Sequence, residues 1–168
     1  MSAVFRRIWA EEYDGKLEYR KKKRKPSRGT ARAKRNRAYV KRILLADDSA
    51  VVRKSMRRMF ERAGWTVCGE ASNGQDAVAI AQGIKPDVIV LDLSMPQMNG
   101  LTAASILKKI MPGTPLILFT SFGNLLSPSD LEFAGFAASI SKSDAGELLT
   151  TAQHLVDASA ASQSRRAV

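Results

Sequence analysis

Apolar and polar residues along 43–158 alternate between the spacing of a strand and the spacing of a helix. Short apolar or alternating runs predict five strands, at 43–46, 65–71, 87–93, 116–119 and 136–140. Between them, apolar residues recur at every third or fourth position and predict five helices, at 49–63, 73–81, 101–110, 128–135 and 143–158. Strands that alternate with helices predict a parallel sheet with helices on both faces.

Residues with strong end preferences mark several of these helices. Asn73 precedes the second helix and has Asp76 three residues later, which is the spacing of a capping box. Ser127 is followed directly by a proline, as at many helix starts. We expect Ser143 to cap the last helix, which should end near residue 158, and Gly64 to end the first.

Residues 41–158 are enough for one α/β domain, and the segment predicts a doubly wound, five-stranded parallel sheet. Right-handed crossovers and short loops favour the strand order 2-1-3-4-5. In such sheets ligands bind at the carboxyl ends of the strands, where the strand order reverses. Here that point lies between the first and third strands.

The residues at the carboxyl ends of the strands therefore form the candidate site. The edge strand ends in Glu70, to which we assign no role, and the other four ends carry Asp47 with Asp48, Asp92, Thr120 and Lys142. Two carboxylates about 4 Å apart repel by roughly 4 kcal/mol at an effective dielectric of 20, so three together require a cation. Mg²⁺ prefers such oxygen ligands and commonly shares them with a phosphate. A lysine and a hydroxyl suit phosphoryl oxygens, and an aspartate can accept the phosphoryl group. The pattern indicates Mg²⁺-dependent phosphoryl transfer onto an aspartate.

The sequence also resembles the receiver domains of two-component response regulators, in particular single-domain receivers of the chemotaxis type. The matching stretches are ILLADDS at 43–49, VIVLDLSMPQMNG at 88–100, Thr120, and SISKSD at 139–144. The resemblance covers 41–158 and implies the flavodoxin-like receiver fold. It implies that Asp92 is the phosphoryl acceptor of a phosphorelay and that the protein is not an enzyme beyond its own phosphorylation and dephosphorylation.

The same resemblance assigns the metal ligands. Asp48 is similar to the residue that binds Mg²⁺ directly, and Asp47 to the one that acts largely through water. Asp92 and the backbone carbonyl of Ser94 would complete the ligands from the protein.

The remaining roles that the resemblance implies concern the phosphoryl group and the signal. Thr120 would bond a phosphoryl oxygen and move on activation, and Lys142 would pair with the phosphate. The phosphodonor would be a sensor histidine kinase or a phosphotransfer protein. An output protein would bind the face formed by the fourth and fifth strands and the last two helices. The chain departs from the family at Ser139, where many members have an aromatic residue that couples to the threonine.

Charge is concentrated ahead of the predicted domain. Residues 1–42 hold 16 Lys and Arg against 4 Asp and Glu, a net charge of +12, whereas 43–168 hold 11 against 12, a net charge of −1. Residues 1–40 are therefore expected to form a disordered basic arm, and 159–168 a flexible tail. The arm has several interpretations: a nonspecific nucleic-acid contact, a contact with an anionic membrane, a solvated tail, or translated sequence upstream of the true start.

Two other functions compete with the receiver. One is an adaptor that binds nucleic acid through the arm, with the receiver as its regulatory module. The other is a phosphatase of the haloacid-dehalogenase type, but that family places a second aspartate two residues after its nucleophile, and this chain has Ser94 there. A single cysteine, Cys68, and the absence of a long apolar run lead us to expect a cytoplasmic protein without a membrane span, as a monomer or weak dimer.

Overall fold

The computed structural model describes residues 39–121 and 127–166, with side chains up to residue 162. The predicted basic arm lies outside these residues apart from Tyr39 and Val40, so its disorder stays a prediction. Within the described part of the chain, no helix is both long and apolar enough to cross a membrane.

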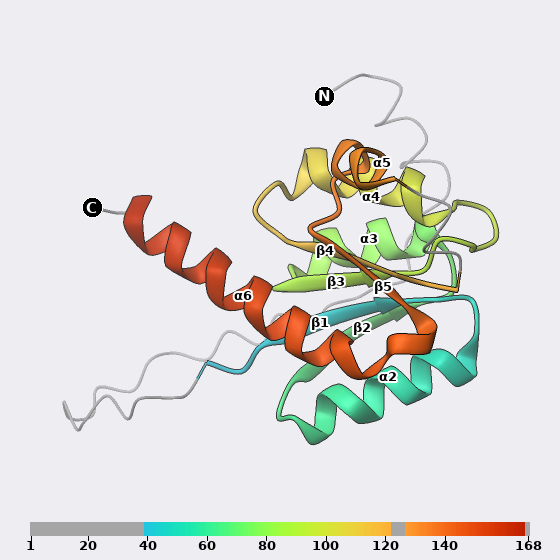
Figure 1. The fold of residues 1–168 in the computed structure, drawn as a ribbon, viewed down its shortest axis with the longest axis horizontal. Helices are drawn as coiled ribbons and strands as arrows, with labels where there is room; N and C mark the ends of the chain where they lie inside the picture. Colours follow the sequence, from blue (N-terminus) through green and yellow to red (C-terminus); the bar gives the residue numbers. More distant parts are fainter. Residues whose placement is uncertain (1–38, 122–126, 167–168) are drawn as a thin grey trace, which may run out of the picture. The chain divides into compact units, whose positions relative to one another are not determined.

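The centre of the domain is a parallel sheet of five strands in the order β2-β1-β3-β4-β5 (Figure 1). The strands are β1 (Arg42–Ala46), β2 (Thr66–Ala71), β3 (Val88–Leu91), β4 (Leu116–Thr120) and β5 (Ala138–Ser141). The predicted fold class and strand order are confirmed. The order reverses between β1 and β3, so the crevice at their carboxyl ends is the expected ligand position.

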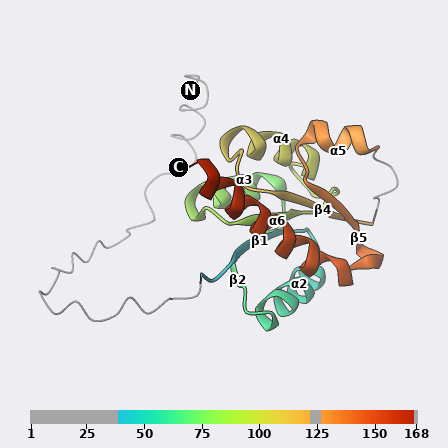
Figure 2. The same ribbon diagram turned by 60° about the vertical axis from the view of Figure 1, so that its left-hand side comes forward.

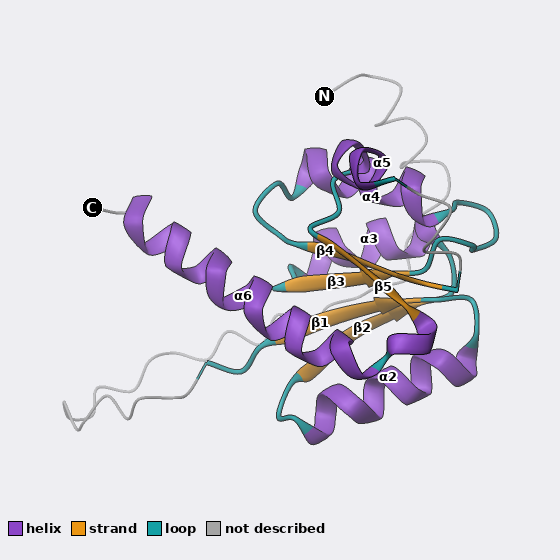
Figure 3. Cartoon of the chain, viewed as in Figure 1, coloured by secondary structure: helices purple, strands orange, loops and turns teal. Residues whose placement is uncertain are grey.

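Helices cover both faces of the sheet (Figure 3). The helices are α2 (Ala50–Arg62), α3 (Gly74–Ile84), α4 (Gly100–Ile110), α5 (Pro128–Ala134) and α6 (Gly146–Arg166), with a short 3-10 helix, η2 (Lys142–Asp144), ahead of the last. Helices α2 and α6 lie on one face and α3, α4 and α5 on the other, as the turned view also shows (Figure 2).

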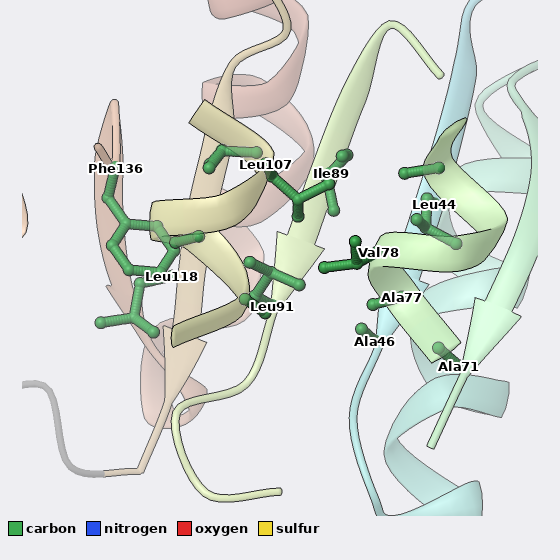
Figure 4. Packing of buried hydrophobic residues seen from close by; sticks show 14 of the residues in the cluster. Leu44, Ala46, Ala71, Ala77, Val78, Ile89, Leu91, Leu107, Leu118 and Phe136 are labelled. Atoms are coloured by element: carbon green, nitrogen blue, oxygen red, sulfur yellow. The ribbon is translucent and has the colours of Figure 1, made fainter. Parts of the chain in front are cut away.

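Alternation along each strand divides the interior into two cores. In β1, Leu44 and Ala46 belong to the cluster that packs against α3, α4 and α5 (Figure 4). Ile43 and Leu45 point the other way, into the cluster with α2 and α6. All four side chains are fully buried. A strand buried on both faces must be apolar throughout, and this explains the unbroken apolar run at 43–46.

Three helices begin at capped residues, of which Asn73 and Ser127 were predicted and Ser49 was not. The Ser49 hydroxyl accepts a hydrogen bond from Val52 N at the start of α2, and the Asn73 side chain accepts one from Asp76 N at the start of α3. Ser127 and Asp130 form a full capping box at α5. Each of these side chains satisfies a backbone N–H in the first turn, and so each determines the residue at which its helix begins.

Several predicted boundaries are wrong. Helix α3 continues past residue 81 to Ile84, because Gly83 does not adopt the left-handed conformation and Lys85, which does, ends the helix. Strand β5 begins two residues late, since Phe136 N still bonds to Leu131 O and closes α5. Ser143 does not cap the last helix, because it lies inside η2. Helix α6 runs on to Arg166, eight residues beyond its predicted end.

The edge of the sheet opposite the strands' carboxyl ends holds the start of the domain. The Tyr39 hydroxyl donates to Asp87, whose other oxygen accepts from Arg42 N at 2.7 Å. Lys41 pairs with Asp157 on α6 at 2.7 Å. These contacts attach the residues before β1 to β3 and α6, far along the strands from the candidate site.

Candidate functional site

Three aspartates meet at the carboxyl ends of β1 and β3. A ligand oxygen from each of Asp47, Asp48 and Asp92 lies within 4.8 Å of the others. Asp47 is fully buried and Asp92 is 3% exposed, whereas Asp48 is exposed to solvent. Asp92 N donates to Ala46 O at 2.8 Å, so the pairing of β1 with β3 continues to the acidic residues and sets their separation.

Lys142 supplies the positive charge of the site from the first residue of η2, directly after β5. Its Nζ atom lies 2.7 Å from Oδ2 of Asp47 and 3.3 Å from Oδ1 of Asp92. Burial alone would lower the pKa of Lys142, but the two aspartates outweigh it and raise that pKa above its usual range. The lysine is therefore held charged, next to the two buried carboxylates.

For Asp92, in contrast, the effect of burial exceeds that of the opposite charge nearby. Burial raises the pKa of Asp92 above its usual range, Lys142 lowers it, and the negative charge of Asp47 raises it again. One lysine therefore does not compensate fully for the burial of this carboxylate. Such a deficit is what a bound cation would remove.

Asp47 gives an independent test of whether a metal fits. Its Oδ1 accepts from Ser49 N at 2.9 Å, and among the described residues its buried Oδ2 meets the Lys142 ammonium at 2.7 Å. That ammonium is shared with Asp92, so one positive charge stands against a cluster of three carboxylates. Oxygen donors alone, close together and with excess negative charge, suit Mg²⁺. The residues present therefore fit this ion.

The other predicted residues lie around this cluster. Thr120 is the last residue of β4 and is fully buried, in register with Ser141 of β5. Ser94 is exposed, in the loop after Asp92, and its carbonyl accepts no hydrogen bond from the described residues. Ser139 is half-buried in β5 opposite Leu118.

The loop after Asp92 depends on a glycine. A Cβ atom on Gly100 would lie 2.1 Å from the carbonyl oxygen of Asp92, which leaves no room for any other residue. Gly100 N also donates to Leu93 O at 3.0 Å, and the loop carbonyl of Met98 accepts from Gly74 N at 2.9 Å. The start of α4 is thus packed directly against the backbone of Asp92.

Sequence reasoning missed two residues, Arg53 and Glu70, that support the backbone of the acidic pair and do not contact its carboxylates. Arg53 of α2 donates to the backbone carbonyls of Asp47 and Asp48, and Glu70 pairs with Arg53. Arg53 stands five residues after the acidic pair, one turn into the helix that the pair precedes. That spacing was visible in the sequence, but the partner strand that brings Glu70 to Arg53 was not.

Comparison with known proteins agrees with this geometry. The family model described as "Response regulator receiver domain" matches residues 43–153. The chain belongs to this family. The match begins at the second residue of β1, so it leaves the basic arm without an assignment.

Individual relatives give the same result. The chain is 39% identical over 83 residues to the chemotaxis protein CheY of Thermotoga maritima, which is 49% of this chain and 69% of that protein. Among solved structures, the response regulator domain of Thermotoga maritima CheB matches with a TM-score of 0.65 and 28% identity, over 71% of this chain and 98% of that one. A CheX-CheY-BeF3-Mg complex from Borrelia burgdorferi matches with a TM-score of 0.57 and 25% identity, over 60% of this chain and 77% of that chain.

Other curated relatives of this receiver are longer proteins. A protein-glutamate methylesterase/protein-glutamine glutaminase of Archaeoglobus fulgidus is 44% identical over 80 residues, but the match covers 23% of its length. The shared part is therefore the receiver, and the activities of the longer proteins are not carried to this chain by the match.

Proposed function

We propose that this receiver accepts a phosphoryl group on Asp92 from a histidine kinase or phosphotransfer protein, with Mg²⁺ bound, and that phosphorylation switches a protein-binding surface. The observation that carries the proposal is the contact set of Asp92. A nearly buried carboxylate stands beside two other aspartates and 3.3 Å from a lysine, at the switch point of the sheet.

Asp47, Asp48, Asp92 and the carbonyl of Ser94 would hold the ion. When bound, Mg²⁺ neutralises charge on the aspartates and on the phosphoryl oxygens. Of these groups, the carboxylate of Asp48 is exposed to solvent, whereas that of Asp47 is enclosed.

In the transfer step, a carboxylate oxygen of Asp92 attacks the phosphorus of the donor's phosphohistidine. The phosphorus–nitrogen bond breaks, and its electron pair stays on the imidazole nitrogen of the donor. Lys142 would pair with one phosphoryl oxygen as its ammonium is released from Asp92, and the Thr120 hydroxyl would donate to another. Phosphorylation replaces the single charge of Asp92 by about −1.5 to −2, which reorganises these two side chains.

An apolar hollow beside the site offers the donor a contact surface. It has a volume of about 280 Å³ and is lined by α2 and the start of α6, with Lys142 at one side and Val51, Met56, Met59, Phe119 and Leu148 among its walls. Val51 on its rim is 78% exposed, although valine is more often buried. A protein donor that covers this hollow would bring its phosphohistidine to the mouth of the site.

The output surface that we propose is the face of β4, β5, α5 and α6. Thr120 ends β4 and Lys142 follows β5, so both residues stand at the ends of the strands that form this face. Ser139 has no ring that can rotate, so the signal would pass to this face without an aromatic side chain at that position.

The test is phosphorylation by a small donor, phosphoramidate, with Mg²⁺. Wild type should gain one phosphoryl group by intact mass, Asp92→Asn should gain none, and the exposed control Asp144→Asn should behave as wild type. Equal modification of wild type and Asp92→Asn would refute the assignment.

A further inference from the structure

We infer that Arg53, oriented by Glu70, is a positioning residue that sets the backbone of the acidic pair for the cation. The inference rests on the proposed function for its purpose, but its geometry is independent of that function. Neither residue carries one of the roles assigned above, and neither touches the carboxylates that would hold the metal.

Arg53 contacts the main chain between β1 and α2. Its Nη1 atom donates to the carbonyl of Asp47 at 2.6 Å and to that of Asp48 at 3.2 Å. These two carbonyls lie just before the first turn of α2, on the residues whose side chains point at the site. A single guanidinium nitrogen thus joins two consecutive peptide units, which restricts the direction of both aspartate side chains.

The two aspartates differ in what else holds them. Asp47 is fixed at several points, because its N–H donates to Ala71 O at 3.2 Å and its carboxylate meets Ser49 N and Lys142. Asp48 has an exposed side chain, and Arg53 is the one hydrogen-bond donor to its carbonyl among the described residues. The backbone orientation of Asp48 therefore depends most on Arg53.

Glu70 forms an ion pair with the Arg53 guanidinium through its Nε atom. Its Oε2 lies 3.7 Å from Nε of Arg53, and its Oε1 accepts from Nε of Arg57 at 2.5 Å. Glu70 sits in β2, in register with Leu45 of β1, so the sheet itself places the carboxylate beside α2. Arg57 is bonded in turn to Glu61 at 2.9 Å.

This network differs from a surface ion pair. The Arg53 side chain is 18% exposed and that of Glu70 is 29% exposed, and the guanidinium donates to two main-chain oxygens besides its ion pair with the acid. Surface pairs alone contribute little, but a planar guanidinium that satisfies several acceptors at once orders the groups that it joins. Partners of this kind, one step behind a metal ligand, typically change metal affinity by 10- to 100-fold when removed.

The experiment compares Arg53→Met, Arg53→Lys and Glu70→Gln in the full chain. Arg58→Met is the matched control, since Arg58 is exposed on the same helix and makes no ion pair with the described residues. Mg²⁺ affinity is measured by calorimetry, and amide hydrogen exchange at Ser49 is measured in metal-free protein. Arg53→Met should weaken Mg²⁺ binding by about 10-fold or more and speed exchange at Ser49. Arg53→Lys should recover part of the affinity, and Glu70→Gln should lose less than Arg53→Met.

Wild-type Mg²⁺ affinity in both Arg53→Met and Glu70→Gln would overturn the inference, even if the melting temperature fell, because that pattern describes a purely structural role. Glu70→Gln keeps the test valid if Arg53→Met fails to fold. If wild type binds no Mg²⁺, the proposed function fails, whereas faster exchange at Ser49 in Arg53→Met would still support positioning.

Discussion

The Nζ atom of Lys142 lies 3.3 Å from Oδ1 of Asp92, although the two residues are 50 positions apart in the chain. Strand β4 separates them in the sheet order, so the contact requires the lysine side chain to reach back over that strand to the end of β3. The result is a nearly buried aspartate whose pKa is raised by burial, and then by the charge of Asp47, more than Lys142 lowers it.

Neutralising Asp92 should stabilise the metal-free domain near neutral pH. Because its pKa is raised in the folded state, the ionised form costs stability, and the cost appears as pH rises above the unfolded value near 3.8. Asp92→Asn should therefore have a higher melting temperature than wild type at pH 7 in a chelator. The difference should shrink as pH falls toward 4, where wild type is protonated. A lower melting temperature for the variant at pH 7 would contradict this balance.

Removing the exposed carboxylate of Asp48 should weaken metal binding without destabilising the fold. Asp48→Asn replaces one carboxylate of the cluster by a neutral amide of similar size, so Mg²⁺ affinity should fall by about tenfold or more. The metal-free melting temperature should stay equal to or above that of wild type, since repulsion is reduced. Calorimetric titration with Mg²⁺ measures this, and Asp144→Asn, outside the cluster, should titrate as wild type.

Two glycines should respond in opposite directions to alanine. Gly100→Ala places a Cβ against the Asp92 carbonyl, so it should destabilise the domain by about 1–3 kcal/mol, as overpacking does, and slow phosphorylation. Gly83→Ala lies in α3 and faces open space, so it should stabilise by about 0.5–1 kcal/mol. Urea unfolding measures both. A tolerated Gly100→Ala would mean that the loop after Asp92 is less tightly packed than the structure has it.

The Tyr39 hydroxyl should ionise at a higher pH than an ordinary tyrosine, because its pKa is raised. Its hydrogen bond to Asp87 is the main cause, with burial next, and together they raise the pKa of Tyr39 to about 12. The raised value means that the contact stabilises the fold below pH 10 and loses that contribution between pH 10 and 12. The difference between absorbance titrations of wild type and Tyr39→Phe isolates this group. A midpoint near 10 would show that the contact with Asp87 is not maintained in solution.

Much of this architecture followed from the sequence because each signal was local. The run at 43–46 is apolar on both sides, which is typical of a central strand, and Asn73 and Ser127 cap their helices through bonds three residues away. The end of α3 was missed because Gly83 does not end the helix and Lys85 does, and the end of α6 was missed because no glycine or proline stands near residue 158. Gly83 is tolerated where no neighbour crowds it, and residues beyond 158 favour helix without an apolar face to reveal it.

The site shows the same division. Asp92 and Lys142 were predicted to converge because strand order alone brings the carboxyl ends together. The role of Glu70 was missed because it depends on the register of β2 beside β1, which places it within reach of Arg53. The register between two strands is set by packing between elements, so it cannot be predicted from the sequence of either strand alone.

The most direct measurement is the chemical location of the phosphoryl group. The protein is incubated with phosphoramidate and Mg²⁺, reduced with borohydride, which converts an aspartyl phosphate to homoserine, and digested for peptide mass spectrometry. We predict homoserine at position 92 and only there, dependent on the donor and on Mg²⁺. Homoserine at another aspartate, or none in protein that has demonstrably gained a phosphoryl group, would contradict the assignment of Asp92 as the acceptor.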